Sequence, residues 1–136
     1  MASRIAEITM RWREHLVFEA GAPGRPLVLV DGDSTVATSP VEMLLVAAAT
    51  CTASDVVLIL EKQRVALRSL EAKVQGTRRE KQPRRYTALH FVFTIAGDGA
   101  DEVKARRAID LSLEKYCSVV ASLAPDIRIS YDIQLR

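Results

Sequence analysis

Cysteine and histidine are scarce in this sequence: Cys51, Cys117, His15 and His90 are the only examples among 136 residues. Two cysteines cannot build the disulfide framework that holds small secreted domains together. Neither histidine stands at metal-ligand spacing from a cysteine, so we expect no metal site and no bound cofactor. The scarcity favours a cytoplasmic protein whose two thiols are reduced at rest.

A large charge of one sign is also missing, because the net charge of +2 is too small to indicate nucleic-acid binding. The N-terminal residues lack a signal-peptide pattern. The apolar part of the central stretch is too short for a membrane span and is interrupted by Asp55, so we expect no membrane segment. Residues 78–85 are the basic exception. They contain proline and glutamate but no interleaved aromatic, so a solvated loop and an anion-binding or partner-binding site both remain open.

The strongest single pattern is a helix over residues 40–63. Ser39 is a favoured N-cap residue, and Pro40 suits the first helical position, where its missing N–H is not needed. Glu42 follows Ser39 by three residues, which predicts a capping box, although an active-site acid is the alternative. Residues 43–49 contain no polar side chain. A helix that is apolar all round has to be buried on every side.

Alternation of apolar and polar residues predicts strands before and after this helix. The predicted strands cover residues 4–12, 16–18, 26–30, 70–76, 86–95 and 127–135, and a second long helix covers residues 101–123. The order βββ-α-ββ-α-β indicates one α+β domain over residues 1–136. A homodimer that buries the central helix between subunits would cover its apolar surface.

Each cysteine lies on the apolar surface of a predicted helix. Both can be inert core residues, because free cysteine packs as a small hydrophobe. Both can also be reactive, since a disulfide forms where two Cα atoms approach within roughly 7 Å. Asp55 lies one helical turn after Cys51 and would raise the thiol pKa unless it were itself paired. We therefore expect an arginine beside it, with Arg13 and Arg84 as candidates.

The segments Ser39-Pro40-Val41-Glu42-Met43-Leu44, Ala47-Ala48-Ala49-Thr50-Cys51 and Glu114-Lys115-Tyr116-Cys117-Ser118 resemble the OsmC/Ohr family. These are the osmotically inducible and organic-hydroperoxide-resistance proteins. The resemblance covers essentially the whole chain and is closest to the YhfA-like branch. It implies an intertwined homodimer with central helices packed between two antiparallel sheets and with active sites at the dimer interface.

The same resemblance implies a thiol peroxidase that acts on organic hydroperoxides. Cys51 would attack the terminal peroxide oxygen and become a sulfenic acid, and Cys117 would condense with it to a disulfide. An external dithiol reductant would restore both thiols. Glu42, Arg13, Arg84 and Asp55 are the candidate supporting residues. The peroxidase branches usually carry glutamate where this chain has Val41, one residue before Glu42.

Two other functions remain open from the sequence. A non-catalytic dimer of this kind would bind a small apolar ligand at the subunit interface. A purely structural protein would keep both cysteines inert in the core.

Overall fold

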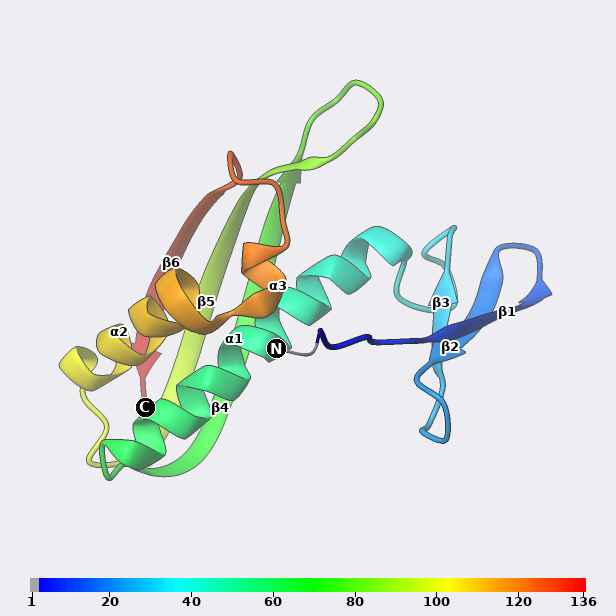
Figure 1. Cartoon of the computed structure of the whole chain (residues 1–136). Helices are drawn as coiled ribbons and strands as arrows, with labels where there is room; N and C mark the ends of the chain where they lie inside the picture. The colour runs from blue at the N-terminus through cyan, green and yellow to red at the C-terminus, as the bar shows by residue number, and fades with distance from the viewer. Residues whose placement is uncertain (1–2) are drawn as a thin grey trace. The chain divides into compact units, whose positions relative to one another are not determined.

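The computed structural model describes residues 3–136, and its strands and helices follow the predicted order (Figure 1). The elements are β1 (Thr9–Glu14), β2 (Val17–Gly21), β3 (Val28–Asp31), α1 (Pro40–Lys62), β4 (Ala66–Arg78), β5 (Tyr86–Asp98), α2 (Glu102–Leu111), the π-helical turn η1 (Ser112–Tyr116), α3 (Ser118–Ala121) and β6 (Arg128–Leu135). The predicted α+β class is confirmed. The chain forms two compact units. The first ends at Leu44, the second is Leu45–Arg136, and each is described by itself.

The first unit holds an antiparallel sheet in the order β1-β2-β3. His15 has a φ of 47° and makes the tight turn from β1 to β2, and histidine is one of the residue types enriched in the left-handed region. The indole N–H of Trp12 donates to the His15 carbonyl at 2.8 Å and ties the turn to β1. Every residue of β1 is exposed, so this strand contributes nothing to a core within the chain.

Asp31 organises the loop that follows β3. Its buried carboxylate accepts hydrogen bonds from the backbone N–H groups of Asp33, Thr35 and Val36 at 2.9 to 3.1 Å, and from the Thr35 hydroxyl. The backbone bonds from Val36 and Asp33 are the largest causes that lower the pKa of Asp31 to about 2. The loop is therefore built around a carboxylate that has to stay ionised.

Helix α1 begins at the predicted capping box. The Glu42 backbone N–H donates to the Ser39 hydroxyl at 3.1 Å, and the Glu42 carboxylate accepts from the Ser39 backbone N–H at 2.9 Å. At 23 residues counted across Asp55, the whole of α1 is by length and composition alone long and apolar enough to cross a membrane. Core helices of the same length and composition also meet this criterion.

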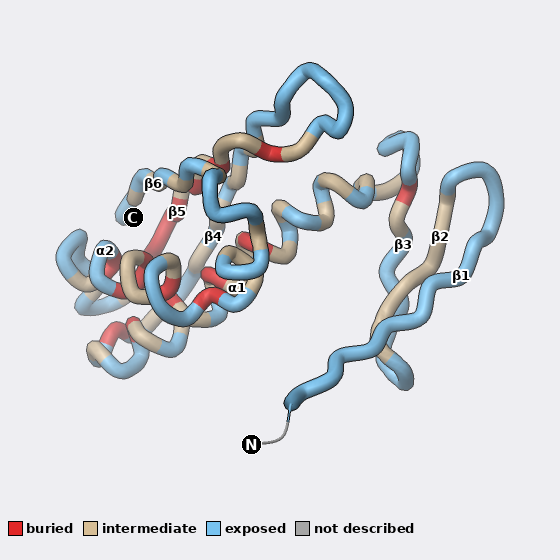
Figure 2. Tube along the Cα trace, turned by 45° about the horizontal axis from the view of Figure 1, so that its top comes forward, coloured by how far each residue is buried: buried red, intermediate tan, exposed pale blue. Residues whose placement is uncertain are grey.

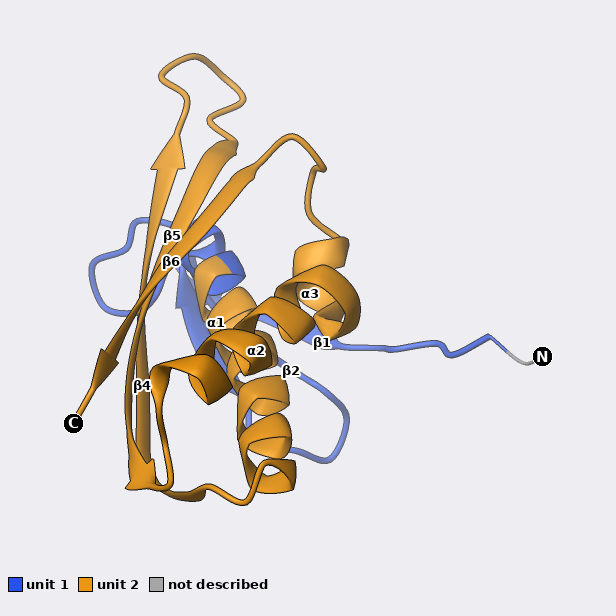
Figure 3. Ribbon diagram, turned by 90° about the vertical axis from the view of Figure 1, so that its left-hand side faces the viewer, with its two compact units in different colours: residues 1–44 blue, residues 45–136 orange. Residues whose placement is uncertain are grey.

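The second unit contains a mixed sheet in the order β4-β5-β6 (Figure 3). Strands β4 and β5 form a long antiparallel hairpin, whereas β6 runs parallel to β5, with Phe91 opposite Tyr131. The expectation of two antiparallel sheets is therefore wrong for β6. The physical reason is that the chain between β5 and β6 passes through α2, η1 and α3, which is long enough for a crossover.

The core of the second unit lies between this sheet and the helices (Figure 2). Leu89, Phe91, Phe93 and Ile95 are each at most 1% exposed, as their alternation along β5 predicted. The Phe91 and Phe93 rings stack with centroids 5.6 Å apart. Helices α1 and α2 lie on the same side of the sheet, so both contribute to this core (Figure 3).

Helix α1 presents one buried stripe rather than an entirely buried surface. Ala48, Thr52, Val56 and Leu60, spaced four residues apart, are fully buried. On the rest of the helix, Leu44, Val46 and Leu58 are 43–57% exposed. Burial on every side is thus not achieved within one chain.

The predicted second helix is interrupted. Helix α2 is capped by Asp101, whose side chain accepts from the Lys104 N–H at 2.8 Å, and it ends at Leu111. The next turn is π-helical, because the Cys117 N–H donates to the carbonyl of Ser112, five residues back, at 2.7 Å. Cys117 itself is extended, with φ −72° and ψ 101°. The prediction of a continuous helix with Cys117 in its middle was therefore wrong.

Candidate thiol site

Cys51 lies in the middle of α1. In sequence it follows the small residues Ala47 to Thr50 and precedes Thr52, which is fully buried. The Cys51 side chain is half-buried and its sulfur is a free thiol. The hydroxyls of Thr50 and Ser54 donate back to carbonyls of the same helix, at 2.8 Å and 2.7 Å, so neither is directed at the thiol. Cys51 is therefore the more accessible of the two sulfurs.

Cys117 is placed by the interruption between η1 and α3. Its side chain is 3% exposed, and its Sγ accepts from the Val120 N–H at 3.5 Å in the manner of an N-cap. The hydroxyl of Thr52, which is fully buried on α1, donates to the same sulfur at 3.4 Å. Thr52 thus ties α1 directly to the segment that carries Cys117.

The two thiols meet, although 65 residues separate them in sequence. Burial is the main cause that raises the pKa of Cys117, and contact with the Cys51 thiol raises it further. The hydrogen bonds from Thr52 and Val120 act in the opposite direction and offset part of this rise. Both cysteines are free rather than joined by a disulfide. The site is therefore a contacting dithiol with one half-buried and one buried, predominantly protonated member.

Asp55 does not have the arginine partner that we expected. Its carboxylate accepts from the hydroxyl of the fully buried Ser112 at 2.8 Å, and no arginine within residues 45–136 lies at ion-pair distance from it. Arg107 lines the same cavity as Asp55 without forming an ion pair with it. A neutral hydroxyl thus replaces the guanidinium in this position.

The other candidate supporting residues have partners of their own. Glu42 belongs to the capping box and also accepts from the Ser34 hydroxyl at 2.7 Å, the largest cause that lowers the pKa of Glu42. Arg13 pairs with Glu19 at 2.9 Å within the first sheet. Arg84 donates from its Nε to the carbonyl of Glu80 at 3.3 Å, inside the basic loop that extends from the β4–β5 hairpin (Figure 1). Capping is thus confirmed for Glu42.

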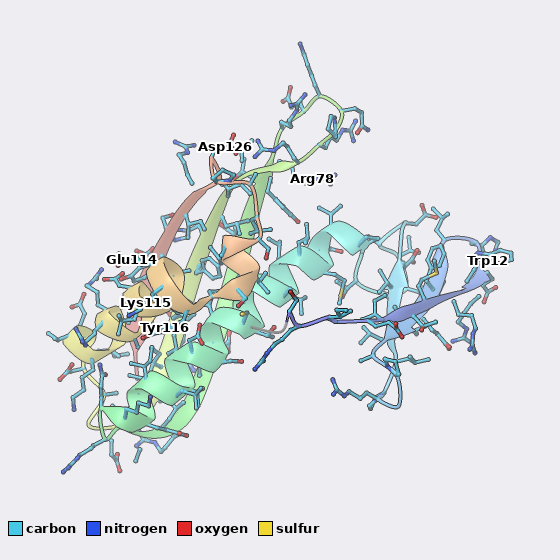
Figure 4. The ribbon with its side chains drawn as sticks, in the orientation of Figure 1. Trp12, Arg78, Glu114, Lys115, Tyr116 and Asp126 are labelled. Atoms are coloured by element: carbon cyan, nitrogen blue, oxygen red, sulfur yellow. The ribbon has the colours of Figure 1, made fainter. Side chains whose placement is uncertain are left out.

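A cavity of about 380 Å³ continues from Asp55 along α1. Its walls carry apolar side chains and two cationic ones, Lys62 of α1 and Arg107 of α2. The apolar lining includes Leu58, Ile59, Leu111 and Tyr116. Glu114, Lys115 and Tyr116 form the exposed outer side of the η1 turn (Figure 4). A small molecule with an apolar body would find room in this cavity, which neither cysteine lines.

Sequence reasoning missed Thr52 and Ser112. Both are short hydroxyl residues on helices, and only their burial against another element reveals their roles. Among residues 3–136, no three His, Cys, Asp or Glu side chains gather in a way that could hold a metal ion. His90 instead contacts Ser130 at 2.7 Å and Asp132 at 3.1 Å across the sheet.

Comparison with known proteins identifies relatives of the whole chain. The family model described as OsmC-like protein matches residues 31–132. Protein YhfA of Escherichia coli strain K12 is 38% identical over 127 residues, which cover 93% of this chain and 95% of that protein.

Two solved structures have a similar fold. A hypothetical protein from Aquifex aeolicus VF5 has a TM-score of 0.86 and 26% identity, covering 98% of this chain and 99% of that one. The organic hydroperoxide resistance protein OhrB of Bacillus subtilis has a TM-score of 0.60 and 13% identity, covering 98% of each chain. The second likeness concerns the fold alone.

Proposed function

The chain belongs to the OsmC-like protein family, as its sequence resemblance predicted, and from this premise we propose that it is a thiol peroxidase for organic hydroperoxides. The observation that carries the proposal is the contact between the two free thiols, one of them half-buried. Two inert core cysteines have no need to meet. The name of OhrB, a protein of the same fold, supports hydroperoxides as the substrate class.

In the first step the Cys51 thiolate attacks the terminal oxygen of the hydroperoxide. The O–O bond breaks, an S–O bond forms, and the alkoxide leaves as an alcohol after taking up a proton. Sulfur gives up two electrons and the peroxide is reduced by them, which leaves Cys51 as a sulfenic acid. Cys51 serves as the attacking residue because it is the more accessible of the two thiols.

In the second step the Cys117 sulfur attacks the sulfenic sulfur of Cys51. An S–S bond forms, the S–O bond breaks, and the hydroxyl leaves with the thiol proton as water. The raised pKa of Cys117 keeps this thiol protonated and unreactive towards peroxide until the sulfenic acid is beside it. An external dithiol then reduces the disulfide by exchange and returns both thiols. A cytoplasmic location, which would supply such a dithiol, stays a prediction.

We further propose that the working unit is a homodimer. Large apolar side chains are exposed in each unit, Met10 and Trp12 on β1 in the first and Val46 and Leu58 on α1 in the second. A second copy of the chain would cover this surface by a symmetric contact. The proposal does not require any residue of the partner in the reaction.

Turnover tests the enzymatic proposal directly. The wild-type protein should consume cumene hydroperoxide continuously in the presence of dithiothreitol, and Cys51→Ser should abolish this consumption. Cys117→Ser should slow the cycle, because dithiothreitol then has to reduce the sulfenic acid itself. The control is Ser54→Ala, which removes an exposed hydroxyl of α1 and should retain wild-type turnover. Equal consumption by the wild type and Cys51→Ser would exclude the mechanism.

The cavity beside Asp55 favours a second candidate function, which is non-catalytic binding of a small apolar ligand. Its volume of about 380 Å³ suits such a molecule. Native mass spectrometry of freshly purified protein distinguishes the two functions. A binding protein should carry a small molecule that the Cys51→Ser variant retains, and it should not consume hydroperoxide.

A further inference from the structure

We propose that Asp55 and Ser112 form a positioning pair that holds Cys117 against Cys51 and thereby sets how readily the disulfide closes. The inference rests on the proposed redox pairing of these two cysteines. Asp55 and Ser112 act as positioning residues, because their side chains hydrogen-bond to each other and the bonds to the Cys117 sulfur come from Thr52 and Val120.

Ser112 contributes two groups to this arrangement. Its hydroxyl donates to the Asp55 carboxylate on α1 at 2.8 Å, and its carbonyl accepts from the Cys117 N–H at 2.7 Å. The first bond fixes the start of η1 to α1 one helical turn from Cys51. The second bond closes the π-helical turn that ends at Cys117. Ser112 therefore links α1 to the backbone of Cys117, in addition to the Thr52 hydroxyl, which links α1 to the Cys117 sulfur.

Burial makes this link rigid. Ser112 is 0% exposed, and a buried hydroxyl without a partner would be costly, so the bond to Asp55 persists in the folded state. The bond also has a charged acceptor, which is the stronger kind. A π-helical turn is rare and often occurs at a functional site, and here it ends at the residue that needs exact placement.

The turn has a consequence for the backbone of Cys117. An α-helical continuation would place its N–H on the carbonyl of Leu113, four residues back, and would keep Cys117 helical. In the structure the N–H instead reaches Ser112, and Cys117 adopts an extended conformation. On this proposal, loss of the Ser112 hydroxyl removes one of the bonds that hold η1 and Cys117 against α1, and Cys117 then samples positions away from Cys51 more often.

The disulfide equilibrium in glutathione buffers tests the inference without using hydroperoxide. The two protein thiols lose two electrons and two protons as the S–S bond forms, and glutathione disulfide takes them up to give two molecules of glutathione. We expect Ser112→Ala to lower the equilibrium constant for the Cys51–Cys117 disulfide about tenfold, the factor that one lost hydrogen bond to a charged group produces. The measurement is the fraction of protein with both thiols blocked from alkylation, read by mass spectrometry.

Matched variants separate positioning from general destabilisation. Ser122→Ala removes a hydroxyl on the neighbouring turn that donates to the Ser118 carbonyl at 2.7 Å, and it should leave the equilibrium constant within twofold of the wild type. Asp55→Leu should resemble Ser112→Ala, whereas Asp55→Asn keeps an acceptor oxygen and should recover most of the wild-type value. Reduced stability alone would affect the dithiol and disulfide forms alike, without changing their ratio.

The outcomes are distinct from those of the turnover assay. An unchanged equilibrium constant in Ser112→Ala, an equal fall in Ser122→Ala, or a wild-type protein that forms no intramolecular disulfide at any glutathione ratio would each overturn the positioning role. If the constants follow the expected order while the wild type fails to consume hydroperoxide, the peroxidase proposal fails and the positioning pair stands.

Discussion

The two units of the chain differ in how much of their apolar surface the chain itself covers. In the second unit the β5 face and one stripe of α1 are almost completely buried. In the first unit β1 is exposed along its whole length, and Met10 and Trp12 are 56% and 63% exposed. The second unit therefore holds the dithiol in a packed core, whereas β1 of the first sheet is exposed along its whole length.

The largest difference between the units should appear in the stability of core variants. Phe91→Ala removes a fully buried ring and should lower the free energy of unfolding by about 3–5 kcal/mol. Leu29→Ala in β3, where the side chain is 42% exposed, should cost about 1 kcal/mol or less in a monomer. Urea denaturation of both variants measures the contrast. Equal losses at low protein concentration would show that the units do not differ in this way.

The next effect concerns assembly through the first unit. Trp12→Ala should weaken the homodimer by about 2 kcal/mol, or roughly thirtyfold in dissociation constant, as expected for an aromatic residue at an interface. Sedimentation equilibrium over a concentration series measures it. Arg11→Ala, on the adjacent exposed residue, is the matched control and should change the constant little. A wild-type protein that stays monomeric at every concentration would contradict the proposed dimer.

Much of the fold was predictable because its determinants are local. The capping box of α1 involves Ser39 and Glu42, three residues apart, and the β5 core face follows from simple alternation. The direction of β6 was not predictable, because its alternation is the same in a parallel and an antiparallel pair. The strand order alone does not encode which way the last strand enters the sheet.

The candidate site was predictable only at its two cysteines. The helical periodicity of residues 101–123 continues through the π-helical turn that ends at Cys117, so it does not reveal the interruption. The hydrogen bond between Ser112 and Asp55 joins residues 57 positions apart. For the same reason the sequence suggested an arginine for Asp55, since a carboxylate near a thiol calls for a partner but does not specify which. Long-range contacts of this kind have no local pattern.

The pH dependence of the first unit provides a third comparison. The folded-state pKa of Asp31, about 2, lies below its ordinary value of 3.8. Its contribution to stability is therefore complete above pH 3.8 and is lost as the pH falls through about 2. Hydrogen exchange of the Val36 amide should accelerate in this window, while the β5 amides stay protected.

Asp31→Asn should flatten this pH dependence by removing the titrating group. Asp33→Asn is the control, because Asp33 contributes only its backbone N–H to the loop and should leave the acid transition in place. A Val36 amide that keeps its protection down to pH 2 in the wild type would contradict the role assigned to Asp31.

The smallest expected effect is a shift in thiol titration within the second unit. Burial raises the pKa of Cys117, so its alkylation by iodoacetamide should reach half-maximal rate above the roughly 8.5 of an unperturbed cysteine. Thr52→Val should raise that midpoint further, because it removes a hydroxyl that donates to the sulfur. A midpoint at or below 8.5 would argue against a buried, protonated Cys117.

Peptide mapping after exposure to a single equivalent of alkyl hydroperoxide shows whether Cys51 and Cys117 form one redox pair. We expect both free thiols to disappear in the folded wild-type protein and the two cysteine-containing peptides to be recovered as one disulfide-linked species. Recovery of both cysteines as free thiols, or of Cys51 over-oxidised beside an unmodified Cys117, would contradict this pairing.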